Sequence, residues 1–210
     1  MENIKQIYQN PDYFENGKRA GLSNYIGYNW QSHGSLAHAQ SSWLYPYFIP
    51  KTVLDVGCAK GLAVSLWRTM ANIDAYGVDI SEYAISQNPK MKKKYLKVCD
   101  IATEKLPFDD NYFDLVTCFE TMEHIPEKEV DFTFLEIHRV MKLSGHGVFS
   151  IALPESVFNE KDIGHITLRQ NDFWKEKLCK YFIIEDGHPI LENPFIKSIG
   201  WNLFIVMKTI

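Results

Sequence analysis

The sequence has no long apolar run, no excess of basic residues and few cysteines. No apolar stretch approaches the roughly 18 residues that a transmembrane helix requires, and the N-terminus lacks the apolar core of a signal peptide. We therefore expect a cytoplasmic protein that does not insert into a membrane. The formal net charge is −4, so no overall positive field would attract nucleic acid, and we expect no nucleic-acid partner.

The cysteines are scattered and form no CxxC pair. This distribution argues against a disulfide framework and against a thiolate zinc site, and it suits a reducing compartment. A free thiol inside a strand or turn behaves as a small apolar residue. The four residues are Cys58, Cys99, Cys118 and Cys179. The chain also carries no internal repeat and no low-complexity tract, and no feature that sets an oligomeric state.

One local cluster of lysines departs from the acidic balance. It consists of Lys90, Lys92, Lys93, Lys94 and Lys97. A solvated helix end and strand entry explain the cluster without any ligand. Phosphate binding is the other interpretation, and the sequence leaves it open.

What the sequence does contain is a strand that turns through glycines into a helix, over residues 52–64. An apolar run with β-branched residues stops at Asp55, and the chain then turns through Gly57 and Gly61. Leu62 and Leu66 come next at helical spacing. Glycines permit close approach of the backbone to a ligand, and the first amides of the helix point at it.

Strands and helices alternate after this turn. The alternation predicts an α/β fold, a Rossmann-like doubly wound sheet with helices on both faces. The last two strands would form a hairpin-like pair, so the sheet would be mostly parallel with an antiparallel last strand. We expect strands at 52–56, 74–79, 95–98, 113–119, 147–153, 181–185 and 202–208, and helices at 60–71, after Ser81, 127–142 and 169–179. Gly145 and Gly147 would bracket the turn into the fifth strand.

The first 50 residues differ from the rest because they are polar and rich in aromatic residues. We expect a helical, aromatic cap segment at 1–50, with helices at 1–8 and 34–46, the second ended by Pro46 and Pro50. The catalytic domain would then span 51–210. Aromatic residues such as Tyr25 and Tyr28 could cap a ligand or simply pack the segment on the sheet.

Acidic residues end three consecutive strands of the predicted sheet. These are Asp55, Asp79 and Asp100. Ligands of open parallel sheets bind beyond the carboxyl ends of the strands. A carboxylate after the second strand can accept hydrogen bonds from both hydroxyls of a ribose, and the next could accept from an adenine amine.

Three segments together resemble class I S-adenosylmethionine-dependent methyltransferases: 53–61, 76–81 and 106–116. The likeness covers roughly residues 50–153 and implies S-adenosylmethionine as the cofactor. The sequence departs from the commonest pattern at Ala59, where the family usually has glycine. By this resemblance the donor would be bound by Asp55, Gly57, Cys58, Gly61, Asp79, Ile80, Asp100, Ile101 and Phe119.

A second cluster of polar residues comes after the strand at 113–119. Two carboxylates and two imidazoles can hold a divalent cation and leave positions for substrate. The Glu-x-x-Glu-His pattern with a later His resembles the metal-dependent O-methyltransferases of ubiquinone biosynthesis and the small-RNA 3′-terminal 2′-O-methyltransferases. By this similarity Mg, Mn or Zn would be bound by Glu120, Glu123, His124 and His165. Catalysis would rest on His124, Glu123 and His165, with His124 as a metal-free general base the alternative.

Three functions remain open from the sequence. The first is O-methylation of a small molecule, such as a sugar, a polysaccharide precursor, or a diol or phenol metabolite. The second is methylation of a terminal ribose 2′-hydroxyl of RNA, for which only the lysine cluster offers phosphate-binding cations. The third is a non-catalytic, nucleotide-binding regulator. We also expect His33, His38 and Trp174 to be candidates for facing the acceptor.

Overall fold

A seven-stranded sheet forms the centre of the protein, in the order β3-β2-β1-β4-β5-β7-β6. The computed structural model describes residues 2–69, 73–92, 94–155, 162–199 and 202–208. Strands β1 to β5 pair in parallel, and β7 runs antiparallel to both β5 and β6. This confirms the predicted α/β class. The strands are β1 (Thr52–Val56), β2 (Asp74–Asp79), β3 (Leu96–Val98), β4 (Phe113–Phe119), β5 (Met141–Ser150), β6 (Phe182–Ile184) and β7 (Leu203–Lys208).

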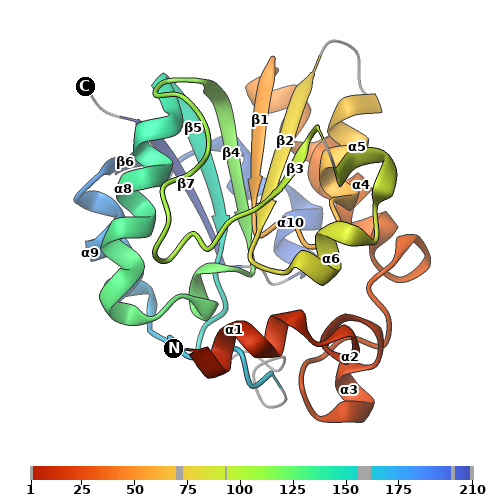
Figure 1. Ribbon diagram of the computed structural model, residues 1–210. Coiled ribbons are helices and arrows are strands. Elements are labelled where there is room, and N and C mark those ends of the chain that lie inside the picture. Colours follow the sequence, from red (N-terminus) through yellow and green to blue (C-terminus); the bar gives the residue numbers. More distant parts are fainter. Residues whose placement is uncertain (1, 70–72, 93, 156–161, 200–201, 209–210) are drawn as a thin grey trace.

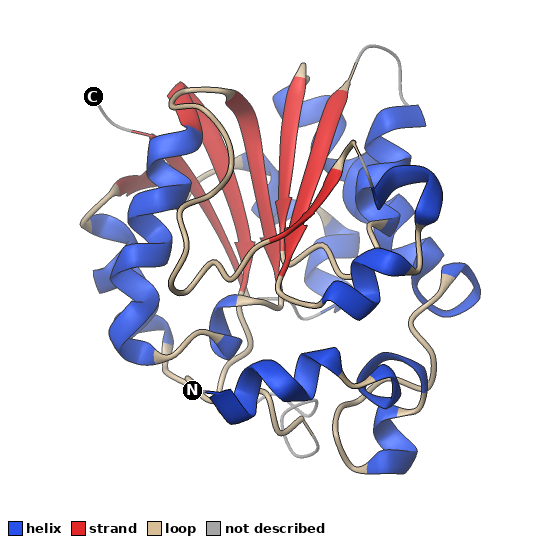
Figure 2. Ribbon diagram, viewed as in Figure 1, coloured by secondary structure: helices blue, strands red, loops and turns tan. Residues whose placement is uncertain are grey.

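Helices cover both faces of the sheet (Figures 1 and 2). The first four helices precede the sheet, and are α1 (Glu2–Gln9), α2 (Pro11–Glu15), α3 (Gly17–Ala20) and α4 (Trp30–Phe48). The later ones are α5 (Leu62–Thr69), α6 (Glu82–Ser86), α7 (Pro89–Lys92), α8 (Val130–Val140), α9 (Asn171–Cys179) and α10 (Pro194–Ile199), with 3₁₀ turns η1 (Met122–His124), η2 (Glu127–Glu129) and η4 (Pro189–Glu192). Among the helices of these described residues, none combines the length and apolar character needed to cross a membrane.

The core divides into two layers because side chains alternate across each strand. In β1, Leu54 belongs to the layer under α8 and α9, and Val53 to the layer under α4, α5 and α10. In β4 the same alternation separates Val116 from Leu115. All four side chains are fully buried. A strand buried on both faces reads as a continuous apolar run, which is why the sequence identified β1 and β4 directly.

The N-terminal helices α1, α2 and α3 lie below the sheet, at the edge where the parallel strands end (Figure 1). They belong to residues 2–29, which we name the arm. The buried aromatic residues of the arm form a cluster of their own against two alanines of the domain, Ala59 and Ala84. Its buried members from the arm are Tyr8, Tyr13 and Phe14.

Helix α4 is longer than predicted at both ends. It begins after Asn29, whose side chain accepts from the amides of Gln31 and Ser32, while the Ser32 side chain accepts from the Asn29 amide. This is a capping box made by serine in place of the usual glutamate. The prediction that Pro46 ends the helix was wrong. Pro46 lies inside the last turn, and the helix ends at Ile49, which has a positive φ of 41°.

Strand β5 begins earlier than the predicted 147–153, directly after α8. The predicted turn at Gly145 and Gly147 was wrong, because both glycines lie within the strand. The register with β4 shifts between Phe113 and Leu115, which marks a bulge. A Cβ at Gly145 would lie 2.8 Å from the Lys142 carbonyl oxygen, so this close packing of backbones needs a glycine.

Candidate functional site

The turn after β1 brings backbone to the carboxyl edge of the sheet. Gly57, Ala59 and Gly61 all have positive φ angles, of 77°, 47° and 67°. The amides of Gly57 and Cys58 both donate to the Val78 carbonyl oxygen, at 2.9 and 3.0 Å. A Cβ at Gly57 would collide with the Thr121 side chain, so this glycine is required by the packing against the end of β4.

The strain at Ala59 gives a testable prediction about stability. A left-handed conformation costs a non-glycine residue about 1–2 kcal/mol, whereas glycine in a helix interior costs about 1 kcal/mol relative to alanine. Ala59→Gly relieves strain, and the matched control Ala37→Gly weakens the middle of α4. We expect Ala59→Gly to be more stable than Ala37→Gly by about 2–3 kcal/mol in urea unfolding, the sum of the two effects. Equal losses in both variants would show that Ala59 is not strained.

Asp79 is held rigidly at the end of β2. Its Oδ2 accepts from the Ala59 amide and its Oδ1 from the Ser81 amide, both at 2.8 Å. Burial raises the pKa of this carboxyl to about 6, although the two amides act in the opposite direction. The carboxylate is therefore oriented before any ligand arrives, and each oxygen keeps a lone pair for a further donor.

The other two strand-end acids are bound differently. Asp100 accepts from the Ala102 amide at 3.1 Å and from the Thr103 hydroxyl at 2.7 Å, and it forms an ion pair with Lys5 of α1. Asp55 is fully enclosed, accepts from the Thr117 hydroxyl at 2.8 Å, and has its pKa raised by burial to about 7.

A cavity lies between the arm and the edge of the sheet, with about 910 Å³ of empty space that is partly open to solvent. Seven predicted donor or metal residues line it: Gly57, Asp79, Ile80, Asp100, Ile101, Glu120 and His124. Asp55, Cys58, Gly61 and Phe119 are not in the lining, and Glu123 and His165 lie behind it. The strand-end acids Asp79 and Asp100 therefore share one cavity with His124.

The arm supplies the opposite wall of the cavity. Its lining residues are Lys5, Tyr8, Tyr13, Phe14 and Tyr25. Among these residues, only Tyr25 was predicted as a possible ligand cap. The rings of Phe14 and Tyr25 stack at 6.2 Å between centroids, and Tyr13 meets both edge-on. The aromatic density of residues 1–50 was the available signal, but it did not distinguish lining residues from packing residues.

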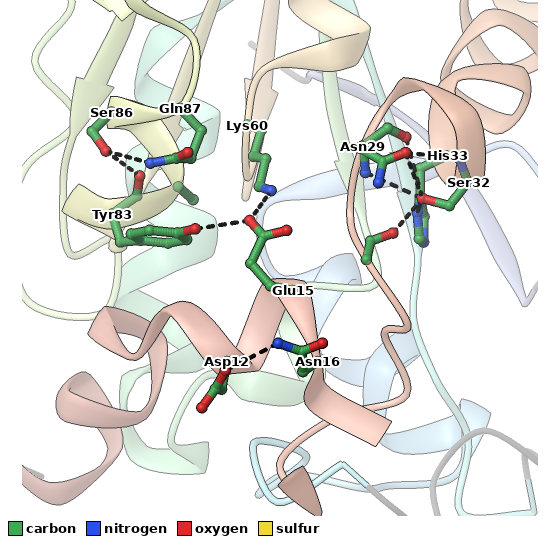
Figure 3. Close-up of polar contacts among 12 residues, drawn as sticks. Asp12, Glu15, Asn16, Asn29, Ser32, His33, Lys60, Tyr83, Ser86 and Gln87 are labelled. Atoms are coloured by element: carbon green, nitrogen blue, oxygen red, sulfur yellow. Dashed lines mark hydrogen bonds and ion pairs between the residues drawn. The ribbon is translucent and has the colours of Figure 1, made fainter. Parts of the chain in front are cut away.

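Polar contacts of Glu15 and Gln9 help to fasten the arm to the domain. Figure 3 shows Glu15 between Lys60, with which it forms an ion pair, and Tyr83, whose hydroxyl donates to Glu15 at 2.8 Å. Gln9 donates to the Ile80 carbonyl oxygen at 2.9 Å and accepts from the Glu82 amide at 3.0 Å. These contacts hold the aromatic wall over the strand-end acids.

Glu123, His124 and His165 come together beside the cavity. One ligand atom from each lies within 4.8 Å of the others. The amides of Ile166 and Thr167 both donate to the Glu123 carbonyl oxygen, at 3.1 and 2.9 Å, which fixes the loop of His165 against η1. Of the four predicted metal ligands, Glu120 lies outside this group, and its carboxylate accepts from the Ser150 hydroxyl.

The electrostatics of this group are unusual for a protein interior. The Glu123 side chain is fully buried, and neither carboxylate oxygen has a hydrogen-bond partner among the described residues. Burial, with Glu120 nearby, raises the pKa of Glu123 well above its ordinary value. Burial and the neighbouring His165 lower the pKa of His124 to about 3. A neutral imidazole is the form that binds metals.

Three residues suggested as candidates for facing the acceptor lie elsewhere. Trp174 is fully buried in the core under α9, and its indole donates to the Arg169 carbonyl oxygen, so that suggestion was wrong. His38 is exposed on α4. His33 stacks on Tyr28 at 4.4 Å between centroids. Neither histidine lines the cavity.

Known proteins resemble this chain in sequence and in fold. Residues 54–149 match the family described as a methyltransferase domain. A solved S-adenosylmethionine-dependent methyltransferase from Archaeoglobus fulgidus has a TM-score of 0.63 and 21% identity, covering 83% of this chain and 94% of that one. At that identity the likeness concerns the fold.

The alignments with curated relatives cover only part of each protein. An uncharacterised protein of Methanocaldococcus jannaschii is 29% identical over 77% of this chain and 71% of its own length. A ubiquinone biosynthesis O-methyltransferase of Acinetobacter baylyi is 32% identical over 48% of this chain and 43% of that protein. A 24-methylenesterol C-methyltransferase of Arabidopsis thaliana is 28% identical over 56% and 34%. The chain thus spans less than half of these two named enzymes.

Proposed function

We propose that this chain is an S-adenosylmethionine-dependent methyltransferase that methylates an oxygen atom of a small acceptor, a proposal that its matched domain and its relatives support. The observation that carries the proposal is one cavity that joins the strand-end acids to the edge of the Glu123, His124 and His165 group. In this proposal residues 1–50 form a cap and residues 51–210 the catalytic domain.

The donor fits the residues around the β1 turn. Gly57 lines the cavity with its backbone, and Asp79 offers two oriented oxygens to the ribose hydroxyls. Asp100 and Ile101 would contact the adenine, with one lone pair of Asp100 Oδ1 still available. Asp55, Cys58, Gly61 and Phe119 would support these groups from behind, since they do not line the cavity.

A divalent cation fits the second group of residues. Two buried carboxylate oxygens of Glu123 without a partner among the described residues, next to two imidazoles, match what a cation requires. Glu123, His124 and His165 would hold it, and Glu120 would be a close neighbour. When bound, the cation would lower the pKa of a hydroxyl in the acceptor. His124 with a pKa of about 3 is better suited to bind a metal than to act as a base.

The protein's main task in the reaction is alignment. A lone pair of the acceptor oxygen forms a bond to the methyl carbon while the carbon–sulfur bond breaks, and its electrons remain on sulfur in S-adenosylhomocysteine. Alignment of this kind can supply up to about 7–11 kcal/mol in favourable cases. The hydroxyl proton has to leave, and Glu120 lines the cavity with a pKa raised by burial, so its carboxylate is a suitable acceptor.

The charges around the cavity restrict the acceptor. Among the residues that line it, the acids are Asp79, Asp100 and Glu120, and the single cation, Lys5, already pairs with Asp100. An acceptor with its own carboxylate or phosphate would find no free cationic side chain among these lining residues, and a desolvated, unpaired charge costs several kcal/mol. With an aromatic wall opposite, we propose a neutral or cationic hydroxylated ring.

A matched series of acceptors tests this proposal. Catechol, 3,4-dihydroxybenzylamine and 3,4-dihydroxybenzoate differ mainly in charge. We expect kcat/KM to be at least about tenfold lower for the benzoate than for the other two, because about 1.4 kcal/mol corresponds to a factor of ten. Methyl transfer from labelled donor provides the measurement. Preference for the benzoate, or turnover only of RNA oligonucleotides, would contradict the assignment.

A further inference from the structure

We propose that Tyr8 of the arm is a positioning residue that fixes the tautomer and orientation of His124. The inference rests on the proposed function, in which His124 serves the reaction. Tyr8 is 8% exposed, and its hydroxyl oxygen lies 2.9 Å from His124 Nδ1 and 3.3 Å from the Gly164 carbonyl oxygen. The Tyr8 and His124 rings meet edge-on at 5.7 Å between centroids.

When both contacts are hydrogen bonds at the same time, they fix the positions of the two protons. A carbonyl oxygen has no proton to donate, so the Tyr8 hydroxyl donates to Gly164. Its oxygen is then an acceptor, and the proton in the short contact with His124 lies on Nδ1. Nε2 therefore keeps its lone pair. This is the nitrogen left to bind a cation or to take a proton.

Gly164 makes this arrangement possible. A Cβ at this position would lie 2.5 Å from the Tyr8 hydroxyl oxygen and 2.8 Å from His124 Nδ1. Such distances are below van der Waals contact, so any larger residue would separate the two groups. Glycine at 164 allows the loop, the arm tyrosine and the histidine to converge on one point.

The arm also holds the loop that carries His165. The Tyr13 hydroxyl donates to both oxygens of Asp162, at 3.0 and 3.1 Å, and the Asp162 side chain accepts from the Gly164 amide at 2.9 Å. Tyr8 is itself fixed, because the Ser81 hydroxyl donates to its carbonyl oxygen. Tyr8 and Tyr13 both lie outside residues 54–149, so a segment beyond the matched domain completes the site.

Nitrogen-15 NMR of the full chain, labelled at histidine and without added metal, reads the tautomer directly. In the wild-type protein we expect His124 to carry its proton on Nδ1, with the resonance assigned by its loss in His124→Asn. In Tyr8→Phe we expect a mixture of tautomers. Tyr181→Phe is the matched control, because it removes a part-buried hydroxyl that contacts Asp131 of α8 instead of His124, and its His124 spectrum should be unchanged.

Kinetics and donor binding complete the experiment. We expect Tyr8→Phe to lower kcat about 10- to 100-fold, the usual effect of losing a partner of a catalytic or metal-binding histidine, with the donor Kd unchanged within about threefold. Gly164→Ala should give the same tautomer mixture if Tyr8→Phe folds poorly. An Nε2-protonated His124 in the wild type, or an unaltered tautomer in Tyr8→Phe, would overturn the inference. Because the tautomer is measured without turnover, absence of activity on every acceptor would count against the proposed function alone.

Discussion

Asp79→Ala is expected to raise the dissociation constant for S-adenosylmethionine by at least about a hundredfold. Each hydrogen bond to a charged group contributes about 1.5–3 kcal/mol, and Asp79 would accept two from the ribose. Their loss amounts to about 3–6 kcal/mol, and every 1.4 kcal/mol is a factor of about ten. Isothermal titration calorimetry with donor and with S-adenosylhomocysteine gives the values.

Asp74 provides the matched control because it begins the same strand that Asp79 ends. Its carboxylate pairs with Arg68 and accepts from the Tyr76 hydroxyl, away from the cavity. Asp74→Ala should leave the donor Kd unchanged. Asp79 also accepts hydrogen bonds from two backbone amides, which Asp79→Ala loses. Thermal unfolding therefore has to show that this variant is folded. Donor affinity close to that of the wild type in a folded Asp79→Ala protein would exclude its role at the ribose.

The raised pKa of Asp79 predicts a pH dependence of the same binding step. Burial raises this pKa to about 6 in the donor-free protein, and the ribose hydroxyls need the carboxylate as acceptor. Binding must release the proton below that pH, so the Kd should be constant above about pH 7 and rise up to about tenfold per pH unit below about 6. Asp79→Asn cannot titrate there. Its donor affinity, although weak, should not show this dependence.

Glu123→Gln should weaken cation binding and lower the methyl-transfer activity, each by at least about a hundredfold. The change keeps the shape of the side chain but removes the charge and one acceptor oxygen from the Glu123, His124 and His165 group. Even outer partners of metal ligands change metal affinity by about 10–100-fold, so a ligand should matter at least as much. Calorimetry with Mn²⁺ and Zn²⁺, together with methyl transfer, measures both losses.

Glu120→Gln is the control for this second prediction. Glu120 precedes Glu123 by one turn but lies outside the three-residue group, and it accepts from Ser150. The Glu120→Gln variant should still bind the cation and lose only the methyl-transfer activity, as expected if Glu120 accepts the proton. Glu123→Gln should remain folded, because a neutral amide is easier to bury than an unpartnered carboxylate. Activity that neither chelators nor added divalent ions affect would exclude the metal while leaving methyl transfer intact.

The sequence predicted which strand ends line the cavity where the information is local. Gly57, Asp79 and Asp100 come directly after apolar runs, so their position at the edge of a parallel sheet could be read without coordinates. The same reasoning included Asp55, Cys58, Gly61 and Phe119, which stand beside the cavity but do not line it. Sequence patterns give the strand end, whereas the direction of each side chain depends on the conformation of the adjoining turn.

Local patterns also explain the errors in the fold. Proline predicts a helix end, yet Pro46 is accommodated in the last turn of α4, where the packing of Leu44 and Phe48 keeps the helix in place. Gly145 and Gly147 predict a turn, yet both lie in β5. Gly145 lies at the bulge against β4, and Gly147 packs against the Val206 side chain. In both cases tertiary packing outweighed a local preference.

By itself the sequence determined the parallel sheet and its acidic edge, because these depend on residue periodicity and on the residue types at the end of each strand. Only the tertiary structure decided that the arm closes the cavity, that Glu123 rather than Glu120 joins the two histidines, and that Tyr8 meets His124. Tyr8 and His124 are 116 residues apart. No short-range preference links such positions, and they meet because burying the aromatic residues of the arm brings its α1 helix against the end of β4.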